Sequence, residues 1–304
     1  MIIGSGPIAR LLATSITSDA RVALGVREST GMFDVRTAQA SRLRGRRSPR
    51  VRRVELWPVS DVDADNWDIV ISTAPVIESD VSELFRAAGP DVVLASVSQV
   101  PSEIEALRDI AGEHRWAVLT PNVLAWTSGM MTHWWQPGAA RFTIAEPVGG
   151  EIAQTLFGGE RWAASGSVSS GLLAAAAVMP MVAALQVSEF EQRICKSTLR
   201  SGAAAADEAG RAVAAAYGVH EPRSVNPVIV GIGLRAMRAC APFDVDNYFR
   251  AHFGSRTHQT KTMLDDWIVL GNTYGLRTEA LVTLRDALSD AAGAPTRRAN
   301  PTKP

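Results

Sequence analysis

Short apolar runs alternate with amphipathic stretches through roughly the first half of the chain. Nearly continuous apolar runs at 67–73, 92–97 and 116–120 are typical of strands that are buried on both faces of a parallel sheet. The stretches between them, near 81–88 and 104–111, carry apolar residues at helical spacing. This alternation predicts an α/β fold in which helices cover both faces of a doubly wound sheet.

The second half of the chain changes to longer helical patterns. Ser188 and Glu191 have the spacing of a capping box, which predicts a helix that begins there and continues into the alanine-rich segment near Ala203. Further helices are predicted at 226–240, at 245–274, where Gly275 ends the pattern, and at 278–291.

These patterns divide the chain into three parts. We expect a sheet domain over 1–187, an all-helical domain over 188–292 and a frayed, Pro-rich and basic tail over 293–304. The uncharged segment 171–187 lies at the boundary and carries Pro180 inside it. It fits a buried helix followed by a strand better than a membrane span, so no membrane partner is expected.

The first residues of the chain form an apolar strand that runs directly into a G-x-G-x-x-A pattern. In a dinucleotide-binding βαβ unit Gly4 would make the turn and Gly6 would let the phosphates approach the backbone, while Ala9 would keep the next helix close to the sheet. The pattern recurs by chance in Gly-rich and Ala-rich chains, but a helical stretch and a second strand follow it here. The predicted cofactor-binding residues in this turn are Gly4, Ser5, Gly6, Pro7 and Ile8.

The end of the second predicted strand bears on the choice of cofactor. Arg27 stands about 20 positions after the glycines, where the adenine ribose is expected, and its guanidinium could bind the 2′-phosphate of NADP. NADP(H) is therefore the expected cofactor. Glu28 follows at once and weakens this preference, and a solvated charge at a strand end is the alternative interpretation of Arg27.

Charge and cysteine content limit the classes of partner. The 31 basic and 31 acidic side chains leave no net charge that would recruit nucleic acid or an acidic membrane. Cys195 and Cys240 lie far apart without a metal-binding spacing, which indicates reduced thiols in a cytoplasmic protein and no metal site. No signal-peptide pattern is expected at the N-terminus, because Gly4 and Gly6 interrupt it.

An arginine-rich run extends from Arg36 to Arg53. A nucleic-acid-binding surface would interleave aromatic residues with these charges, and the run contains none. We interpret it as a solvated edge of the sheet domain and expect no nucleic-acid partner. Some of these arginines could also screen the phosphate of NADP.

Several segments together resemble the ketopantoate reductase (2-dehydropantoate 2-reductase) family over nearly the whole chain. They are Asp68–Thr73, similar to the family's fourth strand; Val93–Gln99, similar to the strand before its active-site Asn-Gly turn; Gln136–Ile144, similar to its Pro-Gly and strand segment; and Gly271–Leu276, similar to the end of its final helix. The resemblance implies a Rossmann-type domain followed by a helical domain that often pairs into a homodimer. It also implies hydride transfer between NADP(H) and a small-molecule substrate.

The resemblance implies roles for individual positions in the sheet domain. Thr73 and Ala74 follow the fourth strand and would border the cofactor, and Ala74 stands where the family has a lysine. Gln99 stands in place of the asparagine of the Asn-Gly turn and would orient substrate.

The resemblance also implies roles in the helical domain. The family's catalytic lysine, on the first helix of that domain, falls on Lys196, and the asparagine four residues later falls on Arg200. A substrate-binding serine falls near Asn247, and an acidic residue falls on Gln259 with His258 before it. Most polar family residues are therefore replaced, so the resemblance implies hydride transfer and favours a substrate other than ketopantoate.

Lys196 could supply both charge stabilisation and a proton. If Cys195 and Leu199 are buried neighbours, a partly dry environment would favour release of the proton from the ammonium group. Arg200 lies one turn later on the same face, so an anion should sit between the two cations. A substrate carboxylate or phosphate could be that anion, and Asp207 is the alternative.

Two further features have open interpretations. His252, Arg256, Gln259 and Met263 form one stripe of the predicted helix 245–274, which faces either the substrate or solvent. Eight tryptophans are mostly expected in the core, although the segment 126–135 could instead indicate a bulky aromatic substrate.

Three functions remain open at this stage. The first is an NADP(H)-dependent oxidoreductase that reduces a small, anionic keto or imine compound, with Lys196 as general acid. The second is ketopantoate reductase proper. The third is a catalytically silent dinucleotide-binding protein that acts as a sensor or partner subunit.

Overall fold

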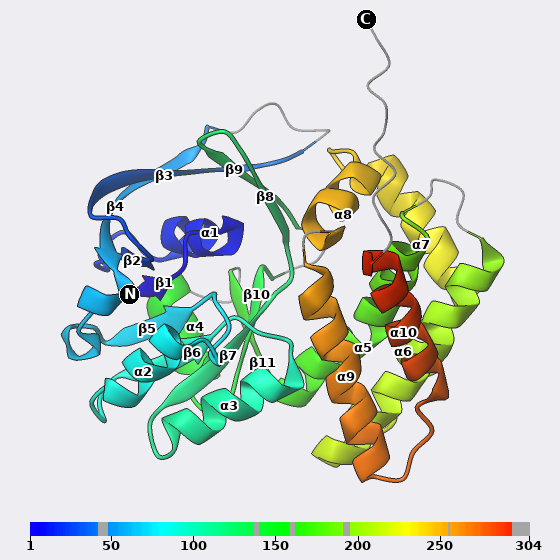
Figure 1. Ribbon diagram of the computed structural model, residues 1–304. Helices are drawn as coiled ribbons and strands as arrows, with labels where there is room; N and C mark the ends of the chain where they lie inside the picture. Colours follow the sequence, from blue (N-terminus) through cyan, green and yellow to red (C-terminus); the bar gives the residue numbers. More distant parts are fainter. Residues whose placement is uncertain (42–47, 137–139, 159–161, 191–194, 255, 294–304) are drawn as a thin grey trace, which may run out of the picture. The chain divides into compact units, whose positions relative to one another are not determined.

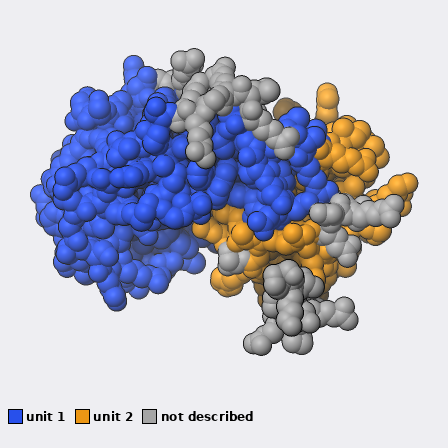
Figure 2. Space-filling view, turned by 90° about the horizontal axis from the view of Figure 1, so that it is seen from above, with its two compact units in different colours: residues 1–175, 236–248 blue, residues 176–235, 249–304 orange. Residues whose placement is uncertain are grey.

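The computed structural model describes residues 1–41, 48–136, 140–158, 162–190, 195–254 and 256–293. The chain forms two compact units (Figure 2), one of Met1–Ala175 with Ala236–Tyr248 and the other of Ala176–Arg235 with Phe249–Pro304. The chain therefore passes from one unit to the other after Ala175, after Arg235 and after Tyr248. All but the first residue of the predicted tail 293–304 lies outside the described residues.

Within the described part of the first unit, eleven strands form one mixed sheet (Figure 1), in the order β11-β10-β7-β6-β5-β1-β2-β4-β3-β9-β8. The strands are β1 (Ile2–Ile3), β2 (Ala23–Val26), β3 (Gly31–Gln39), β4 (Arg50–Pro58), β5 (Ile69–Ser72), β6 (Val93–Ser96), β7 (Trp116–Pro121), β8 (Leu124–Ser128), β9 (Met131–Trp135), β10 (Phe142–Ala145) and β11 (Ala163–Gly166). The strands from β7 to β4 are parallel, which confirms the predicted doubly wound core.

Three of the four helices described between β1 and β11 were predicted, and α4 was not. They are α1 (Pro7–Ser15), α2 (Ser79–Ala87), α3 (Pro101–Ala111) and α4 (Gly149–Phe157), with short 3-10 turns η1 (Val59–Asp61) and η2 (Ala64–Asn66). The sheet also extends beyond β4 and curls over α1, which contacts β3, β8 and β9 as well as the parallel strands (Figure 1). Leu11 and Leu12 on α1 are fully buried.

Part of the arginine-rich run is structural. Arg36 and Arg53 lie exposed on the antiparallel pair β3–β4, whereas Arg52 points inward. Its guanidinium donates hydrogen bonds to carbonyls at and beyond the end of α1, including Ile16 O at 2.9 Å and Thr17 O at 3.0 Å. A cation there complements the negative end of the helix dipole. The arginines at 42–47 lie outside the described residues.

The second unit is helical. One long helix, α5 (Val168–Val187), passes from the first unit into the second. The others are α6 (Lys196–Tyr217), α7 (Pro227–Cys240), α8 (Val245–Gly254), α9 (Thr257–Thr273) and α10 (Glu279–Gly293), of which α7 and α8 also cross the division. Helices α6, α9 and α10 pack together around buried Trp267. The buried carboxylate of Glu208 on α6 accepts a hydrogen bond from the amide of Leu281 at 2.9 Å, which fixes the start of α10.

Three sequence predictions in this region are wrong. Ser188 does not begin a helix: α5 ends there, because Glu189 and Phe190 take the left-handed conformation with φ of 52° and 53°. The amide of Phe190 bonds back to Leu185 O at 2.8 Å, as in a helix C-terminal motif. No strand follows Pro180, since α5 continues through it to Val187. The predicted helix 245–274 is two helices, α8 and α9.

Helix α5 is long and apolar enough to cross a membrane by length and composition, and it is the one such helix in the described ranges. However, 61% of its most apolar window is buried inside the protein, as expected of a core helix.

Candidate dinucleotide-binding site

The turn after β1 has a backbone that only glycine fits. Gly4 has φ of +115°, and its amide donates to Gly25 O on β2 at 2.8 Å. A Cβ atom at Gly4 would lie 2.3 Å from Thr73 Oγ1. Both conformation and space therefore exclude a side chain at this position.

The start of α1 is open at the next glycine. Gly6 is the N-cap residue with extended backbone, no side chain caps the helix, and Pro7 occupies its first turn. A Cβ atom at Gly6 would meet nothing within 4 Å. The amides of Ile8 and Ala9 have no carbonyl one turn before them within the helix, so they are available to an anion that approaches the open side of Gly6.

The loop after β5 completes this turn. Thr73 donates through its amide and its hydroxyl to Ile3 O, each at 2.9 Å. The hydroxyl of buried Ser72 accepts from the amide of Ala74 at 3.2 Å and donates to its carbonyl at 2.8 Å. Thr73 and Ala74, both predicted to border the cofactor, are thereby fixed directly beside Gly4.

Strand order explains why these residues meet. β1 lies between β2 and β5, and the chain leaves β1 toward β2 on one side and reaches β5 on the other. A sheet with such a reversal opens a crevice at the carboxyl ends of its strands, which is where nucleotides bind. Gly4, Arg27, Thr73 and Gln99 follow the carboxyl ends of β1, β2, β5 and β6, so the structure places all four at this edge.

Individual side chains at this edge differ in exposure. Arg27 and Glu28 are both exposed beyond the end of β2, so neither is committed to the core. Gln99 is half-buried. Next to it, the hydroxyl of Ser98 donates to the buried carboxylate of Glu103 at 2.6 Å and accepts from the amide of Val100 at 3.1 Å, which fixes the loop that carries Gln99.

Lys196 is placed differently from the expectation. The first helix after the last strand is α5, whose sequence carries no charged residue, and Lys196 begins the following helix, α6. The lysine is exposed, Cys195 is exposed, and Leu199 is half-buried. The buried neighbours expected around this ammonium group are therefore absent, because both flanking residues lie at the open start of a helix.

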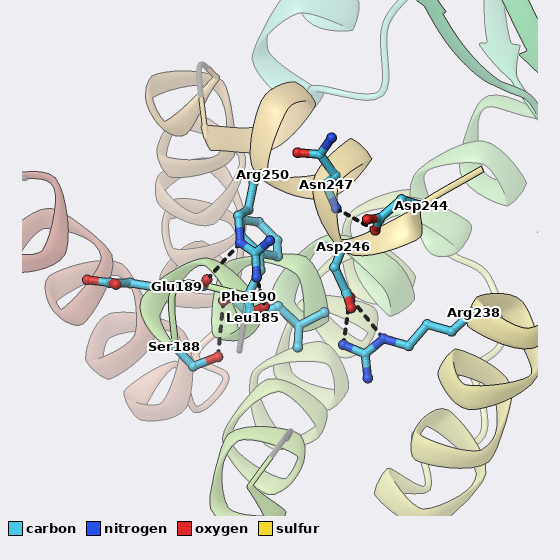
Figure 3. A network of polar contacts seen from close by, with 9 residues as sticks. All are labelled: Leu185, Ser188, Glu189, Phe190, Arg238, Asp244, Asp246, Asn247 and Arg250. Atoms are coloured by element: carbon cyan, nitrogen blue, oxygen red, sulfur yellow. Dashed lines mark hydrogen bonds and ion pairs between the residues drawn. The ribbon is translucent and has the colours of Figure 1, made fainter. Parts of the chain in front are cut away.

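Arg200 and Asn247 also lie near helix starts, whereas Asp207 lies in the middle of α6. Arg200 is exposed on α6, and Asp207, its alternative anion, accepts a hydrogen bond from the amide of Val225 at 2.7 Å. Asn247 lies in the first turn of α8, where its amide donates to Asp244 Oδ1 at 3.0 Å (Figure 3) while its exposed side chain points away from that carboxylate. Among the described contacts, none joins the side chains of Arg200, Asp207 and Asn247 to one another.

The predicted polar stripe does not exist as one face. His252 lies on α8, Arg256 is the N-cap of α9, and Met263 is buried. Gln259 and His258 are exposed in the first turn of α9. Burial, followed by repulsion from Arg256, lowers the pKa of His252 to about 4, so its imidazole is neutral near neutral pH.

The tryptophan pattern resolves into core and a surface cluster. Trp134 is buried on the face of β9 toward α1. Trp126 and Trp135 lie on the opposite face and pack on Phe243, with ring centroids 4.7 and 5.8 Å away, and Tyr248 packs on Phe243 at 5.4 Å. Within the first unit these rings pack against one another, so their contacts are those of an aromatic cluster.

Sequence reasoning missed two elements that support the turn. One is Arg52, which looks like any other member of an arginine-rich run and is distinguished only by its alternation on β4. The other is the buried pair Ser98 and Glu103, whose five-residue spacing spans the start of α3. No group of His, Cys, Asp and Glu residues suited to a metal ion occurs among the described residues.

Comparisons by sequence and by structure give different answers. No family model matches the sequence, and no curated protein matches it. Among solved structures, a ketopantoate reductase from Staphylococcus aureus described as dimeric is similar with a TM-score of 0.65 at 10% identity, covering 96% of this chain and 97% of that chain. A probable 2-dehydropantoate 2-reductase from Bacillus subtilis has a TM-score of 0.64 at 16% identity, covering 95% and 98%.

A dehydrogenase with a different substrate shares the architecture. The ternary structure of D-mandelate dehydrogenase with NADH and anilino(oxo)acetate is similar with a TM-score of 0.66 at 10% identity, covering 96% of this chain and 98% of that chain. These identities are low, but the likeness extends over both units. The resemblance inferred from sequence is confirmed at the level of the fold: this chain has the fold of the ketopantoate reductases and is a divergent structural relative of them.

Proposed function

We propose that the chain is an oxidoreductase that transfers hydride between a nicotinamide dinucleotide and a small keto or imine substrate. The observation that carries the proposal is the turn Gly4–Gly6, closed at Thr73 and open at the start of α1. Solved structures of the same fold support it, since D-mandelate dehydrogenase and octopine dehydrogenase were each determined with NADH.

NADP(H) is the proposed form of the cofactor. Arg27 is exposed at the end of β2, where the ribose of a dinucleotide bound at the turn would lie. A guanidinium can pair with a 2′-phosphate through two hydrogen bonds, whereas Glu28 beside it would suit the free hydroxyls of NAD. Titration calorimetry with NADPH and NADH should give a lower Kd for NADPH, and equal Kd values would contradict the preference.

The proposed substrate is small and anionic. Lys196 would donate a proton to the carbonyl oxygen or imine nitrogen while the nicotinamide delivers hydride to the carbon. Arg200, one turn further on α6, would bind the substrate's carboxylate or phosphate. Gln99, Asn247, His258 and Gln259 are the proposed orienting residues.

A substrate panel tests this role for Lys196. NADPH consumption should be followed by its absorbance with a series of 2-keto acids, ketopantoate included, and with the corresponding imines. Lys196→Ala should lose turnover and keep NADPH affinity, whereas Lys261→Ala, which removes the other lysine of the described ranges, should keep both. Equal loss of turnover and of NADPH affinity in Lys196→Ala would place this lysine in the cofactor site.

A second candidate function is a dinucleotide-binding protein without catalysis, such as a sensor of the NADPH/NADP ratio. It is favoured by the absence of charged residues from α5 and by the exposure of Lys196. In that case NADPH binds, no member of the panel is reduced, and Lys196→Ala has no effect. If neither nucleotide binds, both functions are wrong.

Two further proposals concern the setting of the protein. The chain is proposed to act in the cytoplasm, where the exposed Cys195 and Cys240 would stay reduced. A homodimer is proposed as its assembly, in line with the dimeric ketopantoate reductase of the same fold.

A further inference from the structure

Arg10 is held beside the glycine turn by two side-chain contacts. Its backbone amide closes the first turn of α1 by donating to Gly6 O at 3.1 Å. Its side chain folds back toward the turn, where Nε donates to Ser5 O at 3.0 Å. The guanidinium carbon also lies 5.3 Å from the centre of the Phe33 ring, within the range of a cation–π contact. The half-buried Arg10 is therefore fixed against the turn by its own charged group.

These contacts use only part of the guanidinium group. An arginine side chain has five N–H donors, and Nε supplies the one that binds Ser5 O. The two terminal nitrogens of Arg10 have no hydrogen-bond or ion-pair partner among the residues that the structure describes. Four donors and a positive charge are therefore left for solvent or for an anion that reaches the turn.

Strand order determines on which side of the turn this charge lies. β2, β4 and β3 follow one another on one side of β1, and β5 lies on the other side. The ribose next to adenine is bound at the end of β2 in dinucleotide folds of this kind, so the nicotinamide half extends toward β5. Phe33 belongs to β3, on which α1 packs (Figure 1). Because its guanidinium lies against Phe33, Arg10 is on the adenosine side, where Arg27 follows β2.

We propose that Arg10 is a second ligand of the 2′-phosphate of NADP(H) and selects this cofactor together with Arg27. This inference rests on the proposed function. A phosphate monoester carries between one and two negative charges near pH 7 and has three acceptor oxygens. One guanidinium can bind two of these oxygens, so a second guanidinium from another element finds both charge and acceptors still available. Arg27 comes from the end of β2, and Arg10 comes from the first turns of α1.

The pair also explains how Glu28 can be tolerated. A carboxylate at the end of β2 suits the free ribose hydroxyls of NAD and repels a phosphate. Arg27 and Glu28 alone have no net charge. With Arg10 the three side chains carry one positive charge, which favours the phosphorylated ribose. The preference for NADPH should therefore depend strongly on Arg10.

Calorimetry on Arg10→Met tests the proposal. Methionine keeps an unbranched side chain against Phe33 but removes the charge and the donors. The Kd of NADPH, and that of adenosine 2′,5′-bisphosphate, should rise at least about tenfold, whereas the Kd of NADH should change less than about twofold. Equal rises for NADPH and NADH would mean that Arg10 binds the diphosphate or shapes the turn, and the proposal would be wrong. An unchanged Kd of NADPH would also overturn it.

Arg36→Met is the matched control. Arg36 is an exposed arginine of β3, the strand that carries Phe33, and its neighbours Val35 and Thr37 are buried on the face toward α1. This substitution removes the same charge from the other face of the strand and should leave both nucleotide affinities unchanged. A loss of NADPH affinity equal to that of Arg10→Met would show a general effect of charge, which contradicts the proposed contact.

Salt dependence separates a phosphate contact from a structural role. Between about 0.05 and 0.5 M NaCl, NADPH binding should weaken more in the wild type than in Arg10→Met, because salt screens the contact between guanidinium and phosphate. Equal salt dependence would contradict the contact. If the wild type binds neither NADPH, NADH nor adenosine 2′,5′-bisphosphate, the proposed function fails as well. If it binds NADPH more tightly than NADH and Arg10→Met keeps this preference, only the role of Arg10 is wrong.

Discussion

The carboxyl edge of the sheet and the starts of helices α6 and α9 differ in how they are tied to the fold. At the sheet edge, Gly4, Thr73 and Ile3 are locked by hydrogen bonds and by the absence of space for a Cβ atom. At the helix starts, Lys196 and Gln259 are exposed. The proposed nucleotide site rests on the backbone, whereas the proposed substrate contacts rest on exposed side chains. The first can persist at low identity while the second changes.

The largest expected effect comes from a substitution at Gly4, in the turn after β1. Gly4→Ala should lower the free energy of unfolding by about 3 kcal/mol or more and abolish nucleotide binding, because the new Cβ atom is strained by the positive φ and collides with Thr73 Oγ1. Urea unfolding and calorimetry measure both effects.

Gly6→Ala is the matched control for this change. Its Cβ atom meets nothing within 4 Å of the protein, so stability should change by less than about 1 kcal/mol. The same methyl group would stand where a diphosphate approaches, so NADPH affinity should fall at least about tenfold. Unchanged affinity in Gly6→Ala would argue against a dinucleotide at this turn.

In the helical unit, the pH dependence of stability tests the burial of His252. Its native pKa of about 4 lies below the ordinary value of 6.5, so the unfolded chain binds more protons between these pH values. Stability from this group is therefore complete above about pH 6.5 and is lost as the pH falls toward 4, by up to about 3 kcal/mol.

Replacing His252 with glutamine sharpens this test. The wild type should lose stability more steeply than His252→Gln between pH 6.5 and 4.5, as followed by urea unfolding at each pH. Parallel pH profiles would show that His252 is not buried in the native state. NADPH binding to the sheet edge at pH 7 should be the same in both proteins.

Replacing Arg52 tests how much its hydrogen bonds at the end of α1 stabilise the protein. Arg52→Met should lower the free energy of unfolding by about 2 kcal/mol, because it leaves the final carbonyls of α1 without their donor. Arg53→Met, on the exposed face of the same strand, should change it by less than about 0.5 kcal/mol. Similar melting temperatures for the two variants would count against the Arg52 contact.

The smallest expected effect concerns the rim of the sheet edge. Arg27→Ala should weaken NADPH binding about tenfold, which corresponds to about 1.4 kcal/mol, and should leave NADH binding nearly unchanged. Calorimetry should be carried out with both nucleotides. Equal weakening of NADPH and NADH binding would show that Arg27 does not contact the 2′-phosphate.

The sequence predicted the parts of the fold that depend on local patterns. The strands β5, β6 and β7 are short apolar runs, and the turn at Gly4 depends on three neighbouring residues, so both could be identified without the structure. The end of α5 could not, because the spacing of Ser188 and Glu191 is short enough to arise by chance. The left-handed residues that end the helix are also not glycines.

Non-local contacts explain the other differences. Strand β3 pairs with β9 through positions far apart in the chain, such as Arg36 and Met131, and periodicity cannot reveal this pairing, which also adds the hairpin β8–β9 to the sheet. The spacing of apolar residues over 245–274 fits one continuous helix, although α8 ends at Gly254 and α9 begins at Thr257. The family resemblance placed Lys196 on the first helix of the helical domain. In the structure α5 comes first, and Lys196 begins the next helix, α6.

The curl of the sheet over α1 also bears on the order in which the first unit is completed during synthesis. β8 and β9 close over the helix, yet they are synthesised long after the residues of the turn. While the ribosome is still adding these strands, α1 can pack on β1 to β4, but the side of the helix that β8 and β9 contact stays exposed. The packing around α1 is therefore complete only after β9 has been synthesised.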